Sequence, residues 1–222
     1  MFFPVGDVNL KRGVRPVLTH LIMLLNIVVF VRMVMLPGPA QAAVLDRFGA
    51  VPADLWSGMH PETLLTSLFL HGGWMHLIGN MLFLWVFGDN VEATLGYGRY
   101  LLFYFGGGIA ATMVHALMNP YSSVPCVGAS GAIAACLGAY LIMFPRSRVR
   151  VFFVLILSSF SVPAVLFLGF WILQQLMAGI GAMGMTADTA GVAYWAHIGG
   201  FVFGTVTGLF YRGKARELQD NR

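Results

Sequence analysis

The sequence predicts an all-α membrane protein, a bundle of six transmembrane helices. Of its 222 residues, 58% are hydrophobic and only 10% are charged, and the mean hydropathy is +0.79. A soluble domain carries about 25% charged residues, so this chain has too little polar surface to cover a water-facing globule. The composition excludes a disordered chain, a nucleic-acid-binding module and a secreted disulfide scaffold. The length allows roughly six spans of about 20 residues each.

Six apolar runs, bounded by charged residues, glycine or proline, carry this prediction. They cover residues 17–36, 64–88, 98–118, 128–144, 149–178 and 193–211. We expect each to be helical, because a span in lipid must satisfy its own backbone and no barrel-like alternation is present. The fifth run is too long for an upright span, so we expect it to tilt or bend near 158–163. The helical bundle would be one domain, 17–212, between tails 1–16 and 213–222.

The basic residues predict the orientation of the bundle. Eleven of the 13 fall in the two tails or in the second-to-third and fourth-to-fifth connections: Lys11, Arg12, Arg15, Arg99, Arg146, Arg148, Arg150, Arg212, Lys214, Arg216 and Arg222. Only Arg32 and Arg47 fall on the other side. Basic residues concentrate on the cytoplasmic side, so we expect both termini in the cytoplasm. The first helix has no small-residue cleavage site after it and should be retained rather than removed as a signal peptide.

Two of the outer loops are long. The first, about 37–63, contains Trp56 and four prolines, and we expect it to fold and to lie partly in the membrane interface. The third, about 179–192, is rich in glycine and alanine, and we expect it to be mobile because glycine constrains the backbone little.

Polar side chains within the apolar runs are the functional candidates, because a charged residue in a span costs roughly 2.5–3.5 kcal/mol on insertion scales. They are His71, His76 and Asn80 in the second run, Ser130 at the start of the fourth, and His197 in the sixth. All three runs pass from the outer face inward, so these residues should share the outer half of the bilayer.

Small residues provide a way for two of these helices to approach. His197 shares a helix face with Gly200, Gly204 and Gly208, while Ser130 shares one with Ala134 and Gly138 and is followed by Gly131. Two such faces would let a serine hydroxyl reach an imidazole at about 2.6–3.2 Å.

A serine hydroxyl next to an imidazole points to nucleophilic catalysis. His197 would take the proton of Ser130, and the acidic residues lie in tails, loops or helix ends, which favours a Ser-His dyad over a triad. A tetrahedral intermediate needs hydrogen-bond donors, and His76 and Asn80 are neighbours on one helix face. The backbone N–H of Ser130 would be a further donor, and His71 could orient His76.

These residues resemble the motifs of the rhomboid intramembrane serine proteases. The matching segments are His71–Asn80 (HGGWMHLIGN), Gly128–Gly131 (GASG) and Ala196–Gly204 (AHIGGFVFG), and Glu92 resembles the family's structural glutamate. The resemblance implies that Ser130 is the nucleophile, His197 the general base and acid, and His76 and Asn80 the oxyanion donors. His71, Gly128, Gly131 and Gly200 would support them.

The resemblance also implies a setting for the reaction. The substrate would be a single-span membrane protein cut near the outer end of its helix, within the lipid of a bacterial inner membrane, with no cofactor, metal or nucleic acid. The active site of this multi-pass protein would open to the extracytoplasmic side. The fifth helix and the loop 179–192 look like the family's lateral gate and cap. The short ends of the chain resemble the minimal six-helix bacterial form.

Two positions depart from the family pattern. The Trp-Arg pair common in the first loop is absent, and the stretch before Leu64 reads His60-Pro61-Glu62-Thr63. Many relatives carry an aromatic residue four positions after the serine, where it packs on the catalytic imidazole, and here that residue is Ala134. Other contacts would have to position His197.

Three other functions fit parts of the pattern. Histidines 71, 76 and 197 could form a metal or haem site, although no His-Glu-x-x-His motif is present. Intramembrane histidine and asparagine could line the path of a transporter or proton relay. A catalytically inactive relative could bind membrane helices without cutting them.

Overall fold

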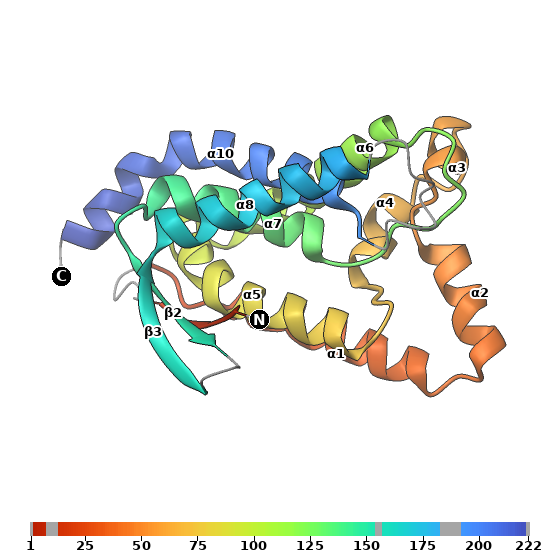
Figure 1. The fold of residues 1–222 in the computed structure, drawn as a ribbon, viewed down its shortest axis with the longest axis horizontal. Coiled ribbons are helices and arrows are strands. Elements are labelled where there is room, and N and C mark those ends of the chain that lie inside the picture. The colour runs from red at the N-terminus through yellow and green to blue at the C-terminus, as the bar shows by residue number, and fades with distance from the viewer. Residues whose placement is uncertain (1, 8–12, 154–156, 183–191, 221–222) are drawn as a thin grey trace.

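The computed structural model describes residues 2–7, 13–153, 157–182 and 192–220, and these are mostly helical (Figure 1). Helices of 14 or more residues among them are α1 (Val17–Val34), α5 (Trp74–Leu95), α6 (Tyr97–Met118), α7 (Ser130–Met143), α8 (Ala164–Gly181) and α10 (Tyr194–Asp220). By length and composition, α1, α6 and α8 can cross a membrane, and α7 is a shorter apolar helix. The chain is therefore a mainly helical membrane protein.

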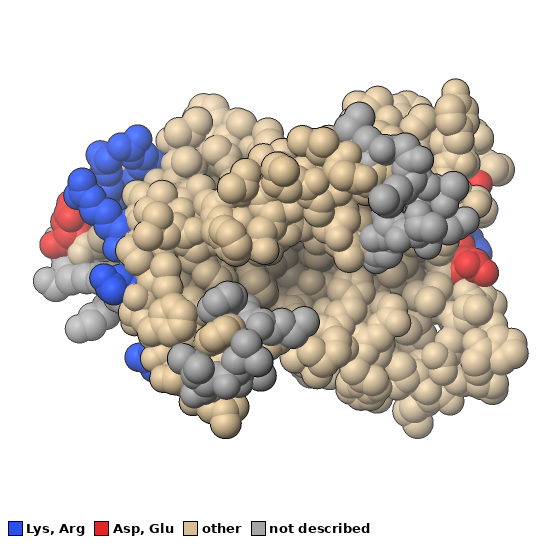
Figure 2. All heavy atoms as spheres, viewed as in Figure 1, with Lys and Arg blue, Asp and Glu red and all other residues tan. Residues whose placement is uncertain are grey.

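Apolar side chains cover the outside of the bundle as well as its core. Leu24 on α1, Phe170 on α8, and Val202 and Phe210 on α10 are all more than half exposed. Lys and Arg gather at the end of the molecule that holds the strands and the C-terminus, and the broad middle of the face in Figure 2 shows no charged residue in colour. A belt of exposed apolar side chains between charged ends is the surface expected of a protein embedded in lipid. We refer to the strand-bearing end as the basic end and to the other as the loop end.

Helix α7 lies at the centre and packs most closely against α10. A β-carbon on Gly204 would come 1.8 Å from the carbonyl oxygen of Ala135, and one on Gly200 would come 2.1 Å from that of Gly131. Only glycine lets the two backbones approach this closely. The prediction that the small-residue faces of these two helices meet is confirmed.

The expectation of a single helix over 149–178 is wrong, and the fold is mainly helical with one small sheet rather than all-α. Residues 148–163 form strands β2 (Arg148–Phe153) and β3 (Ser158–Pro163), and α8 begins only at Ala164. Strand β1 (Phe2–Gly6) pairs antiparallel with β2, giving the sheet order β1-β2-β3. In β2, Val149 and Val151 are buried while Arg148 and Arg150 are exposed, the period of a strand with one covered face.

A glycine and a proline mark two helix boundaries. Gly96, with a φ of +79°, is the only residue between α5 and α6, and Pro163 precedes α8.

Two helices have other bounds than the sequence predicts. The second helix begins at Trp74, ten residues later than predicted, because 63–69 form the short helices α4 (Thr63–Thr66) and η1 (Ser67–Phe69). Helix α10 continues to Asp220, so most of the expected C-terminal tail is helical.

The first long loop folds, as expected, into α2 (Gly38–Phe48) and α3 (Pro52–Trp56). Two contacts hold this loop, in which the Trp-Arg pair is absent. The indole nitrogen of Trp56 donates to the carbonyl of Ala116 at 2.9 Å, and Ala50 forms a β-bridge with Cys126. Residues 183–191 of the third loop lie outside the described residues.

Near the basic end, Glu92 joins α5 to the start of α1. Its carboxylate accepts hydrogen bonds from the backbone N–H groups of Leu18 (2.8 Å) and Thr19 (2.7 Å) and from the Thr19 hydroxyl (2.7 Å). The first N–H groups of a helix have no partner within it, so the carboxylate both caps α1 and is satisfied in a buried position. This contact agrees with the structural role expected for Glu92.

Candidate active site

The candidate residues lie at the starts of three helices. His76 and Asn80 occupy the first two turns of α5, Ser130 is the first residue of α7, and His197 is the fourth residue of α10. Gly128 lies against His76 and Gly131 lies near Ala196, so these three helix starts come together at the loop end of the bundle. The structure thereby assembles side chains that are more than 120 residues apart in the sequence.

His71, His76 and Asn80 form one cluster. The amide nitrogen of Asn80 lies 2.9 Å from Nε2 of the fully buried His71, and the rings of His71 and His76 meet edge to face with centroids 5.1 Å apart. The backbone N–H of Gly72 donates to Nδ1 of His76 at 3.4 Å. An imidazole that accepts at Nδ1 carries its proton on Nε2, so His76 presents Nε2–H as a donor.

That donor faces the chain just before Ser130. A β-carbon on Gly128 would lie 2.7 Å from Nε2 of His76 and 3.5 Å from the amide nitrogen of Asn80. The second N–H of the Asn80 amide remains available, because only one is directed to His71. Two side-chain donors thus point at the backbone two residues before the serine.

Ser130 and His197 lie beside the closest crossing of α7 and α10. The β-carbon position of Gly131 is 3.9 Å from the carbonyl oxygen of Ala196, and the carbonyl oxygen of Gly131 faces Gly200. Ser130 precedes Gly131, and His197 follows Ala196. Within the described residues, the Ser130 hydroxyl and the His197 imidazole are not hydrogen-bonded to one another. Catalytic hydrogen bonds are often long in the absence of substrate and tighten when it binds.

Helix α8 holds the imidazole of His197. Nδ1 of His197 lies 2.8 Å from the side-chain oxygen of Gln175, and the ring of Trp171 lies 5.7 Å from the imidazole, centroid to centroid, at 37°. Trp171 therefore supplies the aromatic contact that the sequence lacks at Ala134. Ala134 itself is fully buried beside Gly200 on α10.

Gln175 is a residue of the candidate site that was not predicted from the sequence. Gln174 and Gln175 form an adjacent pair of amides in the otherwise apolar segment 164–181. A polar residue in a membrane helix is a functional candidate by the same reasoning that selected Asn80. Within the described ranges, no group of three or more His, Cys, Asp or Glu residues is arranged to hold a metal ion.

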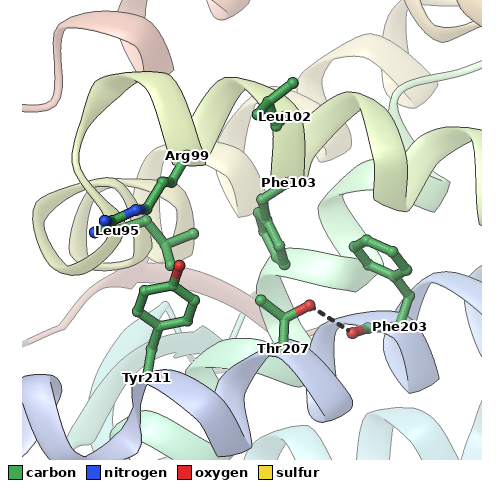
Figure 3. Close-up of a pocket in the computed structure, with 7 residues that line it drawn as sticks. All are labelled: Leu95, Arg99, Leu102, Phe103, Phe203, Thr207 and Tyr211. Carbon is green, nitrogen blue, oxygen red and sulfur yellow. Dashed lines mark hydrogen bonds between the residues drawn. The ribbon is translucent and has the colours of Figure 1, made fainter.

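A groove between α6 and α10, with Leu95 at the end of α5, is shown in Figure 3. Its lining residues are Leu95, Arg99, Leu102, Phe103, Phe203, Thr207 and Tyr211. Phe203 and Tyr211 follow His197 by six and 14 residues, so the groove extends toward the basic end. The hydroxyl of Thr207 donates to the carbonyl of Phe203 and does not enter the groove as a free donor. None of the candidate catalytic residues lines the groove.

Comparison with known proteins agrees with the motifs. A family model described as the rhomboid domain matches residues 55–214. The rhomboid protease GluP of Bacillus subtilis is 36% identical over 156 residues, which cover 70% of this chain and 30% of GluP. The mitochondrial rhomboid protein 1 of Saccharomyces cerevisiae is 29% identical over 164 residues, which cover 72% of this chain and 44% of that protein. The putative rhomboid protease YdcA of Bacillus subtilis is 35% identical over 112 residues, which cover 47% of this chain and 53% of YdcA. The matches thus span between about a third and a half of these relatives.

Proposed function

Because the chain belongs to the rhomboid family, we propose that it is an intramembrane serine endopeptidase that cuts the transmembrane helix of another protein. One observation carries the proposal most strongly. Nε2 of His76 and the amide nitrogen of Asn80 converge on Gly128, two residues before Ser130, as oxyanion donors next to a nucleophile would.

The proposed reaction has two halves. Ser130 Oγ attacks the scissile carbonyl while His197 Nε2 accepts its proton, giving a tetrahedral intermediate. The negative oxygen would be bound by His76 Nε2–H, the Asn80 amide and the backbone N–H of Ser130, which the first turn of α7 leaves unpaired. His197 then returns the proton to the leaving amine, and an acyl-enzyme on Ser130 remains. Water, deprotonated by His197, hydrolyses the acyl-enzyme and restores the hydroxyl.

We further propose that all six long helices span the bilayer, with both termini in the cytoplasm and the candidate site near the extracytoplasmic surface of the bacterial inner membrane. The concentration of Lys and Arg at the basic end supports this orientation. The natural substrates of the protein would be single-span membrane proteins. They would reach the site through the surrounding lipid, with α8 as the lateral gate. Cysteine labelling from each side of the membrane tests the orientation.

The alternative is a family member that binds membrane helices without cutting them. The absence of a hydrogen bond between Ser130 and His197 in the described structure is the observation that favours it. Binding without turnover would leave the serine unreactive toward mechanism-based probes, so the two functions are separable by experiment.

Labelling with a fluorophosphonate probe, followed by a cleavage assay, tests the proposal. The purified protein should be labelled, Ser130→Ala should abolish labelling and cleavage, and the exposed Ser123→Ala should change neither. His197→Ala should remove cleavage, and Asn80→Ala should lower turnover by about 10²–10³, the usual effect of losing one oxyanion donor. Equal labelling of Ser130→Ala would exclude this serine as the nucleophile. Product masses from a panel of single-span proteins would locate the cut.

A further inference from the structure

Gln175 adds a third residue to the proposed pair of Ser130 and His197. Gln175 lies on α8, and its side-chain oxygen is 2.8 Å from Nδ1 of His197. The other end of the amide is also engaged, because Nε2 of Gln175 donates to the carbonyl of Trp171 at 3.4 Å. That second bond orients the amide so that its oxygen, not its nitrogen, faces the imidazole.

The direction of this bond determines where His197 carries its proton. An amide oxygen can only accept, so Nδ1 must donate, and neutral His197 then holds its proton on Nδ1 and leaves Nε2 unprotonated. Only that tautomer can take a proton from Ser130. The other tautomer, with Nε2 protonated, cannot act as the base.

We propose that Gln175 is a positioning residue that fixes His197 in its reactive tautomer and orientation, in the place that a carboxylate holds in a catalytic triad. The role in cleavage rests on the proposed function. Trp171, one turn earlier on α8, packs against the same ring and limits its rotation.

A neutral amide suits this location better than an acid. Helix α8 contains no charged residue, and its neighbours Leu173 and Met177 are exposed on the apolar surface of the bundle. An ionised carboxylate in such surroundings would carry a large desolvation penalty, whereas an amide accepts the hydrogen bond without burying a charge.

Because both contacts come from α8, the geometry of the dyad depends on the position of that helix. Gln175 contacts His197, and Trp171 contacts Phe201 one turn further along α10. Gly179, one turn after Gln175 on α8, packs against Tyr194. Movement of α8 away from α10 would withdraw the acceptor and the ring together. The proposed gate helix would thereby also control the competence of the base.

Gln175→Leu tests the proposal against Gln174→Leu, the same change at the adjacent, exposed glutamine. With the parent active and Ser130→Ala inactive, we expect Gln175→Leu to lower kcat by about 10- to 100-fold, by analogy with the loss of the hydrogen-bond partner of a metal-bound histidine, with little change in KM. Gln174→Leu should cleave at the parent rate. Equal thermal melting of both variants in detergent would show that folding is retained. Parent-like cleavage by Gln175→Leu would overturn the proposal.

A second measurement does not require activity. Nitrogen-15 NMR of histidine-labelled protein, with His197 assigned from a His197→Asn sample, reports which ring nitrogen is protonated. We expect Nδ1–H in the parent and in Ser130→Ala, and a shift toward Nε2–H in Gln175→Leu. A parent protonated on Nε2 would overturn the proposal even if the protein cleaves. Nδ1–H that depends on Gln175 in a protein that does not cleave would instead leave the contact intact and remove the proposed protease function.

Discussion

Gly128 lies directly against the imidazole of His76. A β-carbon at position 128 would come 2.7 Å from His76 Nε2, and the backbone there has a φ of +124°, where side chains other than glycine are strained. The position therefore needs glycine for two independent reasons, its conformation and the space left for the proposed oxyanion donors.

We expect Gly128→Ala to lower kcat/KM by about 100-fold or more, since the new methyl would displace a donor that is worth about 10²–10³ in turnover. Gly72→Ala is the matched control, because its β-carbon would be 4.0 Å from Nδ1 of the same histidine, an ordinary contact. Cleavage rates and melting temperatures of the two variants, measured side by side, test this. Full activity in Gly128→Ala would show that His76 and Asn80 are not needed where the structure places them.

The close crossing of α7 and α10 predicts that alanine destabilises the protein at Gly204 but not at Gly169. Gly204→Ala would push a methyl to 1.8 Å from the Ala135 carbonyl, and the helices would have to separate. Overpacking of a tight interface costs about 1–3 kcal/mol or more, so the melting temperature should fall and cleavage with it. Gly169→Ala, in a helix but with nothing within 4 Å of its β-carbon, should be neutral or slightly stabilising. Equal stability of the two variants would contradict the packing described for this interface.

The hydrogen bonds of Glu92, far from the candidate site, predict that a substitution there lowers the stability of the protein. Glu92→Gln replaces one acceptor oxygen with a donor that faces the N–H groups of Leu18 or Thr19. Hydrogen bonds to a charged group are worth about 1.5–3 kcal/mol, and we expect a loss of that size in the free energy of unfolding. Asp46→Asn, at an exposed position on α2, should change it little. Denaturation in detergent measures the free energy of unfolding of both variants. A Glu92→Gln variant as stable as the parent would argue against the cap on α1.

The sequence predicted well those elements whose structure follows from local pattern. The run 17–36 corresponds to α1 (Val17–Val34) and 98–118 to α6 (Tyr97–Met118), since long apolar stretches in lipid can satisfy their backbone only as helix. The meeting of Gly200 with Gly131 was also readable, because helical spacing places small residues on one face.

The sheet and the contacts of His197 could not be read in the same way. A short apolar run such as 149–157 fits a helix or a buried strand equally, and one of the two strands that pair with β2 is Phe2–Gly6, more than 140 residues earlier. Likewise, Gln175 lies 22 residues before His197, and only the packing of α8 on α10 brings the two together. Such long-range pairings depend on tertiary structure rather than on local periodicity.

A disulfide between α8 and α10 can test whether α8 must move for substrate to enter. The β-carbon position of Gly179 is 3.5 Å from that of Tyr194, within the range of about 3.5–4.5 Å found in disulfides. A Gly179→Cys/Tyr194→Cys variant should therefore oxidise readily and lock α8 against α10. The native thiols should not compete, because Cys136 is fully buried and burial raises the pKa of Cys126 to about 12, which leaves little thiolate at pH 8.

The oxidised variant should separate gating from chemistry. The lock keeps Gln175 and Trp171 against His197, so a small fluorophosphonate should still label Ser130, whereas cleavage of a single-span substrate should fall at least tenfold and recover with reductant. The single variants Gly179→Cys and Tyr194→Cys, under the same oxidation, should cleave normally. If the oxidised double variant cut its substrate as fast as the reduced one, entry would not require α8 to leave α10, and the base would remain held throughout the cycle.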